Sequence, residues 1–392
     1  MNLKGETADL GDAVVATFRS ALRGELLDPS ADDYDAARRV WNGNIDRRPA
    51  LIARCAGVSD VQRAVVFARE RALTLSVRGG GHSAPGYGTN DGGLVIDLSG
   101  MKGIRVDPEA RTARAEGGAL WCDFDHETQA FGLATTGGTV SNTGIGGLTL
   151  GGGIGWMHGL HGLTVDNLLS VDLVTADGSF LTVSDTQHPD LFWALRGGGG
   201  NFGVAVSFEY RVHPVSTVLG GLMLYPLERG RDVLRFYRDF CPALPDEAGF
   251  AAGCLTVPDG TVVAALVPAY TGSVEKGLET FAPIKAALGE PIADLVGPMS
   301  YAERQSLLDD LSGWRPGERA FIQILAVRAL VRHRDTLVQT AGRLCWDRGQ
   351  IPAAPPRLRH ARKKAVAMPE PSPALESGQR EQRPKAAACR LR

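Results

Sequence analysis

The glycines of this chain are concentrated in one stretch. Of the 49 glycines in 392 residues, 29 lie between Gly79 and Gly203. Glycine has no Cβ, so it allows backbone conformations and close approaches that other residues forbid, although it costs roughly 0.5 to 1 kcal/mol relative to alanine inside a helix or strand. A stretch so rich in glycine therefore predicts backbone conformations or close backbone contacts that side chains would prevent.

The same stretch and its flanks carry the patterns of both strands and helices. Apolar runs or alternation predict strands over Leu73–Val77, Leu94–Leu98, Thr112–Glu116, Leu168–Thr175 and Val204–Val212. Helical spacing of apolar residues predicts helices over Ser59–Leu73, with Ser59 as N-cap, over Leu120–Phe131 and over Pro189–Leu195. This mixture predicts an α+β fold.

Beyond about Val215 the glycine density falls and a second region begins. Strands are expected over Gly221–Tyr225, Ala251–Val257 and Thr261–Tyr270, and helices over Leu227–Phe240 and Ser273–Ala287. We therefore expect an N-terminal helical segment at 1–39, a glycine-rich domain at 40–215, a smaller α/β domain at 216–345, and a tail at 346–392. The tail is predicted to be disordered, since 351–392 holds seven prolines and almost no aromatic residues.

Composition excludes several classes of protein. Hydrophobic residues at 44% and charged residues at 22% are ordinary globular values. No apolar run reaches the roughly 18 residues of a membrane span, and Met1–Leu22 carries acids, so we expect a soluble, cytoplasmic protein without a membrane partner. The six cysteines form no CxxC pair, which predicts reduced thiols and no zinc site.

Two further groups of residues are expected to have no binding role. His158 and His161 have no third ligand nearby, so no metal is expected. From Gly342 onward the chain holds 12 Lys/Arg and 4 Asp/Glu, but without interleaved aromatic residues this basic tail does not predict nucleic-acid binding.

The first glycine motif follows the predicted strand Leu73–Val77. It consists of Arg78, Gly79, Gly80, Gly81, His82 and Ser83. Three successive glycines allow backbone N–H groups to approach a phosphate closely. Gly79, Gly81 and Ala84 fit the permissive dinucleotide fingerprint, but a turn-forming segment, 85–88, follows where that fingerprint needs a helix. A Rossmann interpretation therefore fails at this motif. Gly198, Gly200 and Gly203 also match the fingerprint, but they follow a predicted helix and open a predicted strand, which reverses the required order and disfavours nicotinamide binding.

The second glycine motif runs from Thr135 to Trp156. Regularly placed apolar residues, among them Ile145, Leu148 and Trp156, distinguish it from a flexible linker. Closely spaced glycines and small hydroxyl residues suit a backbone pressed against a large planar or phosphorylated ligand, with N–H groups as donors. The motif predicts a bulky cofactor.

Together with 93–99, 162–167 and 196–204, these two motifs closely resemble one family. The chain is similar to the FAD-linked oxidases of the vanillyl-alcohol-oxidase type, with a PCMH-type FAD-binding domain, nearest the berberine-bridge-enzyme-like members. The resemblance covers about Pro49–Pro214. It implies that 40–215 is a two-subdomain FAD-binding domain with the flavin between the subdomains, that 216–345 is the substrate domain, and that FAD is the cofactor.

The resemblance also implies roles for individual residues. The first motif, from Arg78 to Ser83, and the segment 137–147 would wrap the flavin, His82 would bond covalently to its 8α-methyl group, and Val206 would contact the adenine side. The expected contacts in the second motif are Gly137, Gly138, Thr139, Thr143, Gly144, Gly146 and Gly147.

Two departures from the family limit these expectations. Val140 stands where bicovalent members have a cysteine, so only one covalent bond to the flavin is expected. Ile145 stands where side-chain bulk controls oxygen access in related members, which leaves dioxygen or another acceptor open as the oxidant.

The expected reaction is hydride transfer from a small alcohol, carbohydrate or secondary metabolite to the flavin. No base can be named, because Tyr225, Tyr270 and Tyr301 are each expected to serve packing. Four residues between Leu120 and Phe131 are expected to form a solvated face without chemistry: Asp123, Asp125, His126 and Glu127. The sequence indicates no oligomeric state.

The family's C-terminal signature is not found in this chain. An Asn-Tyr pair and a closing Lys-x-x-Tyr-Asp-Pro-like segment would follow in the family, yet the resemblance weakens after about Ser312, which predicts a truncation or a change of reading frame. The alternative function is therefore an inactive flavin-binding remnant. A noncovalent reductase of the cell-wall-precursor type is disfavoured, because such enzymes lack the histidine that is His82 here.

Overall fold

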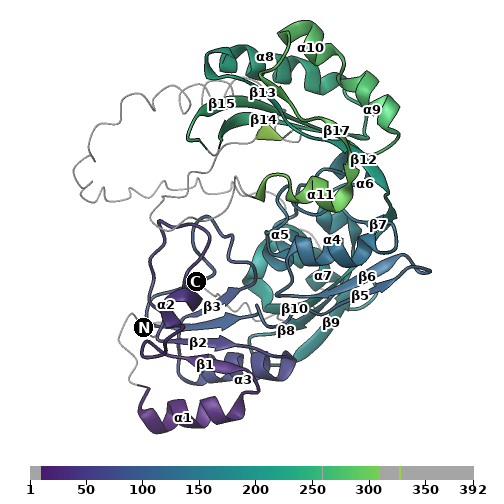
Figure 1. Ribbon diagram of the computed structural model, residues 1–392. Coiled ribbons are helices and arrows are strands. Elements are labelled where there is room, and N and C mark those ends of the chain that lie inside the picture. Colours follow the sequence, from purple (N-terminus) through teal and green to yellow (C-terminus); the bar gives the residue numbers. More distant parts are fainter. Residues whose placement is uncertain (1–9, 258, 310–325, 328–392) are drawn as a thin grey trace, which may run out of the picture. The chain divides into compact units, whose positions relative to one another are not determined.

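A computed structural model describes residues 10–257, 259–309 and 326–327 of the chain. All of them lie within the first of two units into which the chain divides, Met1–Cys345. The described residues form three main β-sheets with helices packed against them, which confirms the α+β fold (Figure 1). None of the described helices is long and apolar enough to cross a membrane.

The first sheet has the strand order β1-β2-β4-β3. Its strands are β1 (Glu25–Leu27), β2 (Leu51–Arg54), β3 (Leu75–Arg78) and β4 (Leu94–Asp97). β2, β4 and β3 are parallel, and β1 is antiparallel to β2. β2 and β3 run parallel on either side of β4, so the chain must cross over between them, and α3 (Val58–Glu70) makes this connection. The segment before β2 was expected to be helical. It contains the helices α1 (Asp12–Ala21) and α2 (Tyr34–Ala37), and it also contributes the strand β1 to this sheet.

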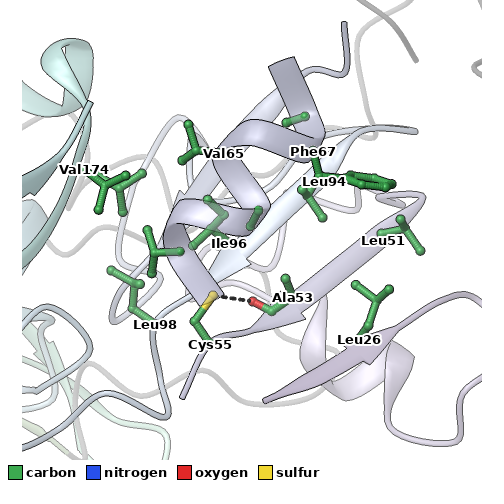
Figure 2. Close-up of a cluster of buried hydrophobic side chains, with 14 of the residues drawn as sticks. Leu26, Leu51, Ala53, Cys55, Val65, Phe67, Leu94, Ile96, Leu98 and Val174 are labelled. Atoms are coloured by element: carbon green, nitrogen blue, oxygen red, sulfur yellow. Dashed lines mark hydrogen bonds between the residues drawn. The ribbon is translucent and has the colours of Figure 1, made fainter. Parts of the chain in front are cut away.

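The core of this part lies between the first sheet and α3. Apolar side chains from three strands meet one face of the helix, as Figure 2 shows for Ile96, Leu94 and Val65. Cys55 belongs to the same core, with its thiol 3.6 Å from the carbonyl oxygen of Ala53. This core fixes the end of β3, and the first glycine motif begins there.

The start of α3 differs from the expectation. The helix begins at Val58, after Gly57, so Ser59 lies inside the first turn and is not the N-cap. The carboxylate of Asp60 explains the shift, since it accepts hydrogen bonds from the backbone N–H groups of Arg23, Gly24 and Ala56 at 2.9 to 3.0 Å. These bonds fix the helix start to the chain just before β1 and to the chain just after β2.

The second sheet is antiparallel and has the order β5-β6-β10-β8-β9. Its strands are β5 (Ile104–Asp107), β6 (Thr112–Glu116), β8 (Leu168–Val174), β9 (Phe180–Ser184) and β10 (Val204–Arg211). Alternation in β6 turns Ala113 and Ala115 inward, where the exposed fraction of each is 1% or less. The helices of this part, with one short strand pair, are α4 (Trp121–Gln129), α5 (Ile145–Leu150), α6 (His158–His161), η1 (Thr164–Asn167), α7 (Pro189–Gly198), η2 (Gly199–Phe202), β7 (Leu133–Ala134) and β11 (His213–Pro214).

The third sheet is built around β15 (Val262–Tyr270). β12 (Thr217–Gly220) and β13 (Met223–Pro226) pair with one edge of β15, and β14 (Ala248–Thr256) pairs with the other. The remaining elements of this part are η3 (Leu227–Arg229), α8 (Gly230–Phe240), η4 (Cys241–Ala243), α9 (Val274–Phe281), α10 (Pro283–Leu288), β16 (Ala293–Asp294), β17 (Gly297–Ser300), α11 (Tyr301–Ser306) and β18 (Ala326–Val327).

Two details of this region correct the expectations. The single helix expected over Ser273–Ala287 is two helices, because Pro283 cannot continue the first and instead opens the second. Cys55, Cys122 and Cys241 are free, but Cys254 is disulfide-bonded, so the expectation of reduced thiols is wrong for that residue. Cysteine spacing alone could not reveal this. The predicted tail, 346–392, lies outside the described residues.

Candidate functional site

The two glycine motifs meet backbone to backbone. A Cβ on Gly80 would lie 2.4 Å from the amide nitrogen of Gly144, and a Cβ on Gly144 would lie 2.3 Å from the amide nitrogen of Gly80. Real Cβ atoms do not come this close to backbone atoms, so the contact requires glycine at both positions. The structure therefore brings together the two segments that the sequence singled out.

A third backbone segment supports this junction. The carbonyl oxygen of Gly117 lies 3.0 Å from the Cβ position of Gly79 and 3.4 Å from that of Gly146. The N–H of Gly117 donates to the carbonyl of Val206 in β10 at 2.8 Å. Val206 itself is buried in the core of the first sheet, so its side chain serves packing in this structure.

The junction is rich in backbone donors. Within the described residues, the N–H groups of Gly79, Gly80, Gly81, Gly138 and Gly144 form no hydrogen bond to a protein acceptor. Backbone N–H groups need partners, and a run of them on a close-packed turn suits the oxygens of a phosphate.

There is also room beside the junction. A Cβ added to Gly147, in the first turn of α5, would meet no atom within 4 Å. Gly81 has a φ of +72°, a backbone conformation that favours glycine. Unpartnered N–H groups beside open space are what a large phosphorylated cofactor needs, so these residues fit FAD.

His82 lies where the two loops meet. Its ring stacks on Trp41, with the ring centroids 5.4 Å apart. Burial lowers the pKa of His82, and this effect outweighs the backbone of Asn142 and the charge of Asp309, both of which raise it. The imidazole is therefore neutral at pH 7, and a neutral ring has one nitrogen with a lone pair.

The first motif begins and ends with side chains that stabilise the chain. Arg78 donates a hydrogen bond to the carbonyl of Ala37 and lies 3.8 Å from the carboxylate of Asp97. Its Nε is buried and has no partner among the described residues. The hydroxyl of Ser83 accepts from the N–H of Tyr87 at 3.0 Å, which closes the turn that stands in place of a Rossmann helix.

The second motif is held by two tryptophans. The indole N–H of Trp156 donates to the carbonyl of Thr139 at 3.3 Å, and the backbone N–H of Trp121 donates to the carbonyl of Thr143 at 3.0 Å. The Trp121 ring also lies 2.9 Å from the Cβ position of Gly137. Gly138 is similarly close to Leu148, at 2.8 Å. The loop is therefore packed, as the apolar residues within it predicted.

One expectation about α4 is wrong. Asp125 is not on a solvated face: it is 1% exposed, because Trp121, Phe124 and Thr128 share its side of the helix. Asp125 accepts a hydrogen bond from the amide of Gln305 at 3.2 Å, across the contact between α4 and α11 (Figure 1). Burial raises the pKa of Asp125 to about 8.

The other face of α11 brings more polar groups into this contact. Arg304 is 1% exposed and lies over the ring of Trp156, with the guanidinium carbon 3.6 Å from the ring centroid. Its three side-chain nitrogens have no hydrogen-bond partner among the described residues. The sequence analysis did not single out Arg304 or Gln305. The sequence held one hint of this contact: helical spacing places Asp125 on the same side of its helix as the apolar residue Trp121.

The three tyrosines considered as bases have structural partners. The hydroxyl of Tyr301 donates to the carbonyl of Thr135 at 3.3 Å, and that of Tyr225 donates to the carbonyl of Gly289 at 3.4 Å. Tyr270 is 4% exposed in the core of the third sheet. Burial raises the pKa of all three, so none is poised to take a proton at neutral pH.

The two histidines of α6 do not converge on a metal position. His158 contacts the carbonyl of Gly155 through Nδ1 at 2.7 Å, and the ring of His161 stacks on His213 at 3.6 Å. Within the part of the chain that the structure describes, no group of three His, Cys, Asp or Glu side chains could hold a metal ion.

Comparison with known proteins points to the same region. A family model described as an FAD binding domain matches residues 49–184. An FAD-linked oxidoreductase of Dictyostelium discoideum is 35% identical over 300 residues, which cover 76% of this chain and 65% of that protein.

Solved structures agree with this match. 6-Hydroxy-D-nicotine oxidase from Arthrobacter nicotinovorans superposes with a TM-score of 0.68 at 32% identity, over 73% of this chain and 64% of that one. Xylooligosaccharide oxidase from Myceliophthora thermophila, in complex with xylobiose, gives 0.64 at 27% identity, over 79% of this chain and 65% of that one. The chain thus spans just under two thirds of the length of each relative.

Proposed function

Because the chain belongs to the vanillyl-alcohol-oxidase superfamily of FAD-linked oxidoreductases, we propose that it oxidises a small alcohol, carbohydrate or secondary metabolite, using FAD attached through His82. When bound, FAD supplies the electron sink, which accepts a hydride from the substrate and passes the electrons to dioxygen or another acceptor.

The observation that carries the proposal is the contact between Gly80 and Gly144. It presses two loops together at a distance that only glycine permits, and it leaves a row of backbone N–H groups without protein partners among the described residues. These groups would bind the pyrophosphate of the cofactor, since charge-assisted bonds from N–H to phosphate oxygen are among the stronger hydrogen bonds in proteins.

The surroundings of His82 support a covalent attachment. The ring stacks on Trp41, and burial keeps it neutral. A neutral imidazole has one nitrogen that carries a lone pair, and this nitrogen would bond to the flavin carbon. Val140 has no thiol, which limits the proposed attachment to this one bond.

The names of the relatives support the substrate class without choosing within it. One solved structure is an oxidase of 6-hydroxy-D-nicotine, and another is an oxidase of xylooligosaccharides crystallised with xylobiose. Alkaloid and carbohydrate substrates are both small molecules, and we propose this class for the present chain. Ile145, buried at the start of α5, leaves the choice between dioxygen and another acceptor to experiment.

The test is reduction of the bound flavin. Purified protein is mixed anaerobically with a panel of sugars, alcohols and hydroxylated alkaloids, and the visible flavin absorbance is followed; air is then admitted to test reoxidation. Bleaching by one member of the panel supports an active oxidoreductase. Bound flavin that every compound leaves oxidised would instead favour the inactive flavin-binding remnant. A chain that binds no flavin would contradict both.

A further inference from the structure

A carboxylate beyond α11 reaches the second glycine loop. Asp309 accepts a hydrogen bond from the backbone N–H of Ser141 at 3.0 Å and another from its hydroxyl at 2.5 Å. The carbonyl of Ser141 in turn accepts from the N–H of Cys122 at 2.8 Å. Ser141, which is 2% exposed, is therefore held at three atoms.

The residues after Ser141 make the junction between the loops. The backbone of Asn142 lies close enough to His82 to raise the pKa of its ring, and Gly144 packs against Gly80. Gly144 follows Ser141 by only three positions in the chain, so a displacement of Ser141 would move both contacts.

The position of Asp309 is fixed by α11. Tyr301 at the start of this helix bonds to Thr135, and Gln305 in its last turn bonds to Asp125. The first turn is closed by Ser300 and Glu303, which cap each other's backbone N–H groups at 2.7 and 3.2 Å. The carboxylate thus sits at the end of a short helix that is bonded to the rest of the site at both ends.

Asp309 acts on the site through charge as well as through bonds. Its negative charge favours the protonated form of His82 and so opposes the stronger effect of burial on the pKa of that ring. The two actions are separable, because an asparagine in its place would keep an oxygen acceptor for Ser141 and lose the charge.

We propose that Asp309 is a positioning residue of the cofactor site, which acts through Ser141 to keep the two glycine loops in contact and to hold Asn142 against His82. The identity of the cofactor rests on the proposed function. The contacts themselves involve only protein atoms, so they can be tested whether or not flavin is bound.

The test compares three variants of the full chain. Asp309→Ala removes the bonds and the charge, whereas Asp309→Asn removes the charge. Asp177 offers a matched control in the turn between β8 and β9, where its carboxylate likewise accepts from a backbone N–H, that of Ser179 at 3.0 Å, and from a hydroxyl, that of Thr175 at 2.5 Å. Asp177→Ala therefore removes an equivalent pair of bonds elsewhere.

Two measurements are made on these proteins. In Asp309→Ala, hydrogen exchange over residues 137–144 should be at least about tenfold faster than in the parent chain. Over the same residues it should be unchanged in Asp177→Ala and nearly unchanged in Asp309→Asn. An NMR titration of His82 in chain produced under riboflavin limitation should give a lower pKa in Asp309→Asn than in the parent, which loss of a merely structural contact would not produce.

Equal loop exchange in the parent and in Asp309→Ala would overturn the positioning role, and an unchanged His82 pKa in Asp309→Asn would overturn the action through charge. If Asp309→Ala does not fold, Ser141→Ala takes the place of that variant in the exchange comparison, because it removes the hydroxyl that donates to Asp309. A parent chain without flavin would contradict the proposed function, while the exchange comparison would still decide the role of Asp309.

Discussion

Two contacts hold the candidate site together, and they differ in kind. Gly80 and Gly144 join the glycine loops through backbone atoms alone, whereas α4 and α11 meet through the buried polar side chains of Asp125, Gln305 and Arg304. The first contact tolerates no added atom. The second contains polar atoms without partners among the described residues, which is costly in a protein interior. The candidate site thus rests on one contact that admits no added atom and on another that leaves buried polar atoms without partners among the described residues.

Breaking the backbone contact should have the largest effect. In Gly80→Ala the new Cβ would lie 2.4 and 2.6 Å from the N and Cα of Gly144, so the loops must separate. We expect FAD affinity to fall by about 100-fold and the free energy of unfolding by about 2 kcal/mol. FAD titration and urea unfolding measure the two changes.

Gly297→Ala is the control for this substitution, because its Cβ would meet nothing within 4 Å. Gly80→Ala that binds FAD as tightly as this control would show that the loop contact does not shape the site.

The side-chain contact should make stability depend on pH. The pKa of Asp125 is raised by burial from 3.8 to about 8, so between these values the folded state keeps a proton that the unfolded state has lost. Folding therefore becomes less favourable as pH rises through this window, by up to about 1.4 kcal/mol per pH unit. Asp125→Asn cannot ionise and should flatten the dependence, as urea unfolding at several pH values would show.

Glu127→Gln, at an exposed position of the same helix, controls for the loss of a carboxyl group. If the parent and Asp125→Asn showed parallel pH profiles, the buried carboxyl would not be the source of the dependence.

A smaller effect is expected at Arg304. Its guanidinium is buried over Trp156, and burial lowers its pKa to about 9. The contact with the ring recovers about 0.5 to 2 kcal/mol, less than the several kcal/mol that burying an ion costs. Arg304→Met, similar in length and uncharged, should therefore raise the free energy of unfolding by about 1 kcal/mol. A loss of stability instead would reveal a partner that the described residues do not contain.

The backbone contact could be predicted from the sequence, whereas the side-chain contact could not. The effect of glycine on the backbone depends on the residue itself, so the clustering between Gly79 and Gly203 is enough to predict the loops and a cofactor beside them. Alternation is equally informative in β6, where the predicted strand Thr112–Glu116 and the observed strand coincide. Both signals depend on the residue itself or on its near neighbours.

Buried polar contacts depend on partners far away in the sequence. The pattern around Asp125 predicts its helix but assigns its polar residues to solvent, since Gln305 lies 180 residues further along the chain. Asp309 gives no signal for the same reason, because its partner Ser141 is 168 residues away. The start of α3 also depends on a distant contact, from Asp60 to Arg23 and Gly24, which moves it away from Ser59.

Retention of flavin by the denatured chain tests whether the glycine loops and His82 hold FAD. The parent chain and His82→Ala are produced with riboflavin, precipitated with acid and run on a denaturing gel, and flavin fluorescence is recorded. We expect yellow parent protein whose fluorescence stays with the polypeptide, and a variant that binds FAD but loses it on denaturation. A colourless parent chain would show that the loops do not hold FAD, and fluorescence retained in His82→Ala would show that His82 is not the point of attachment.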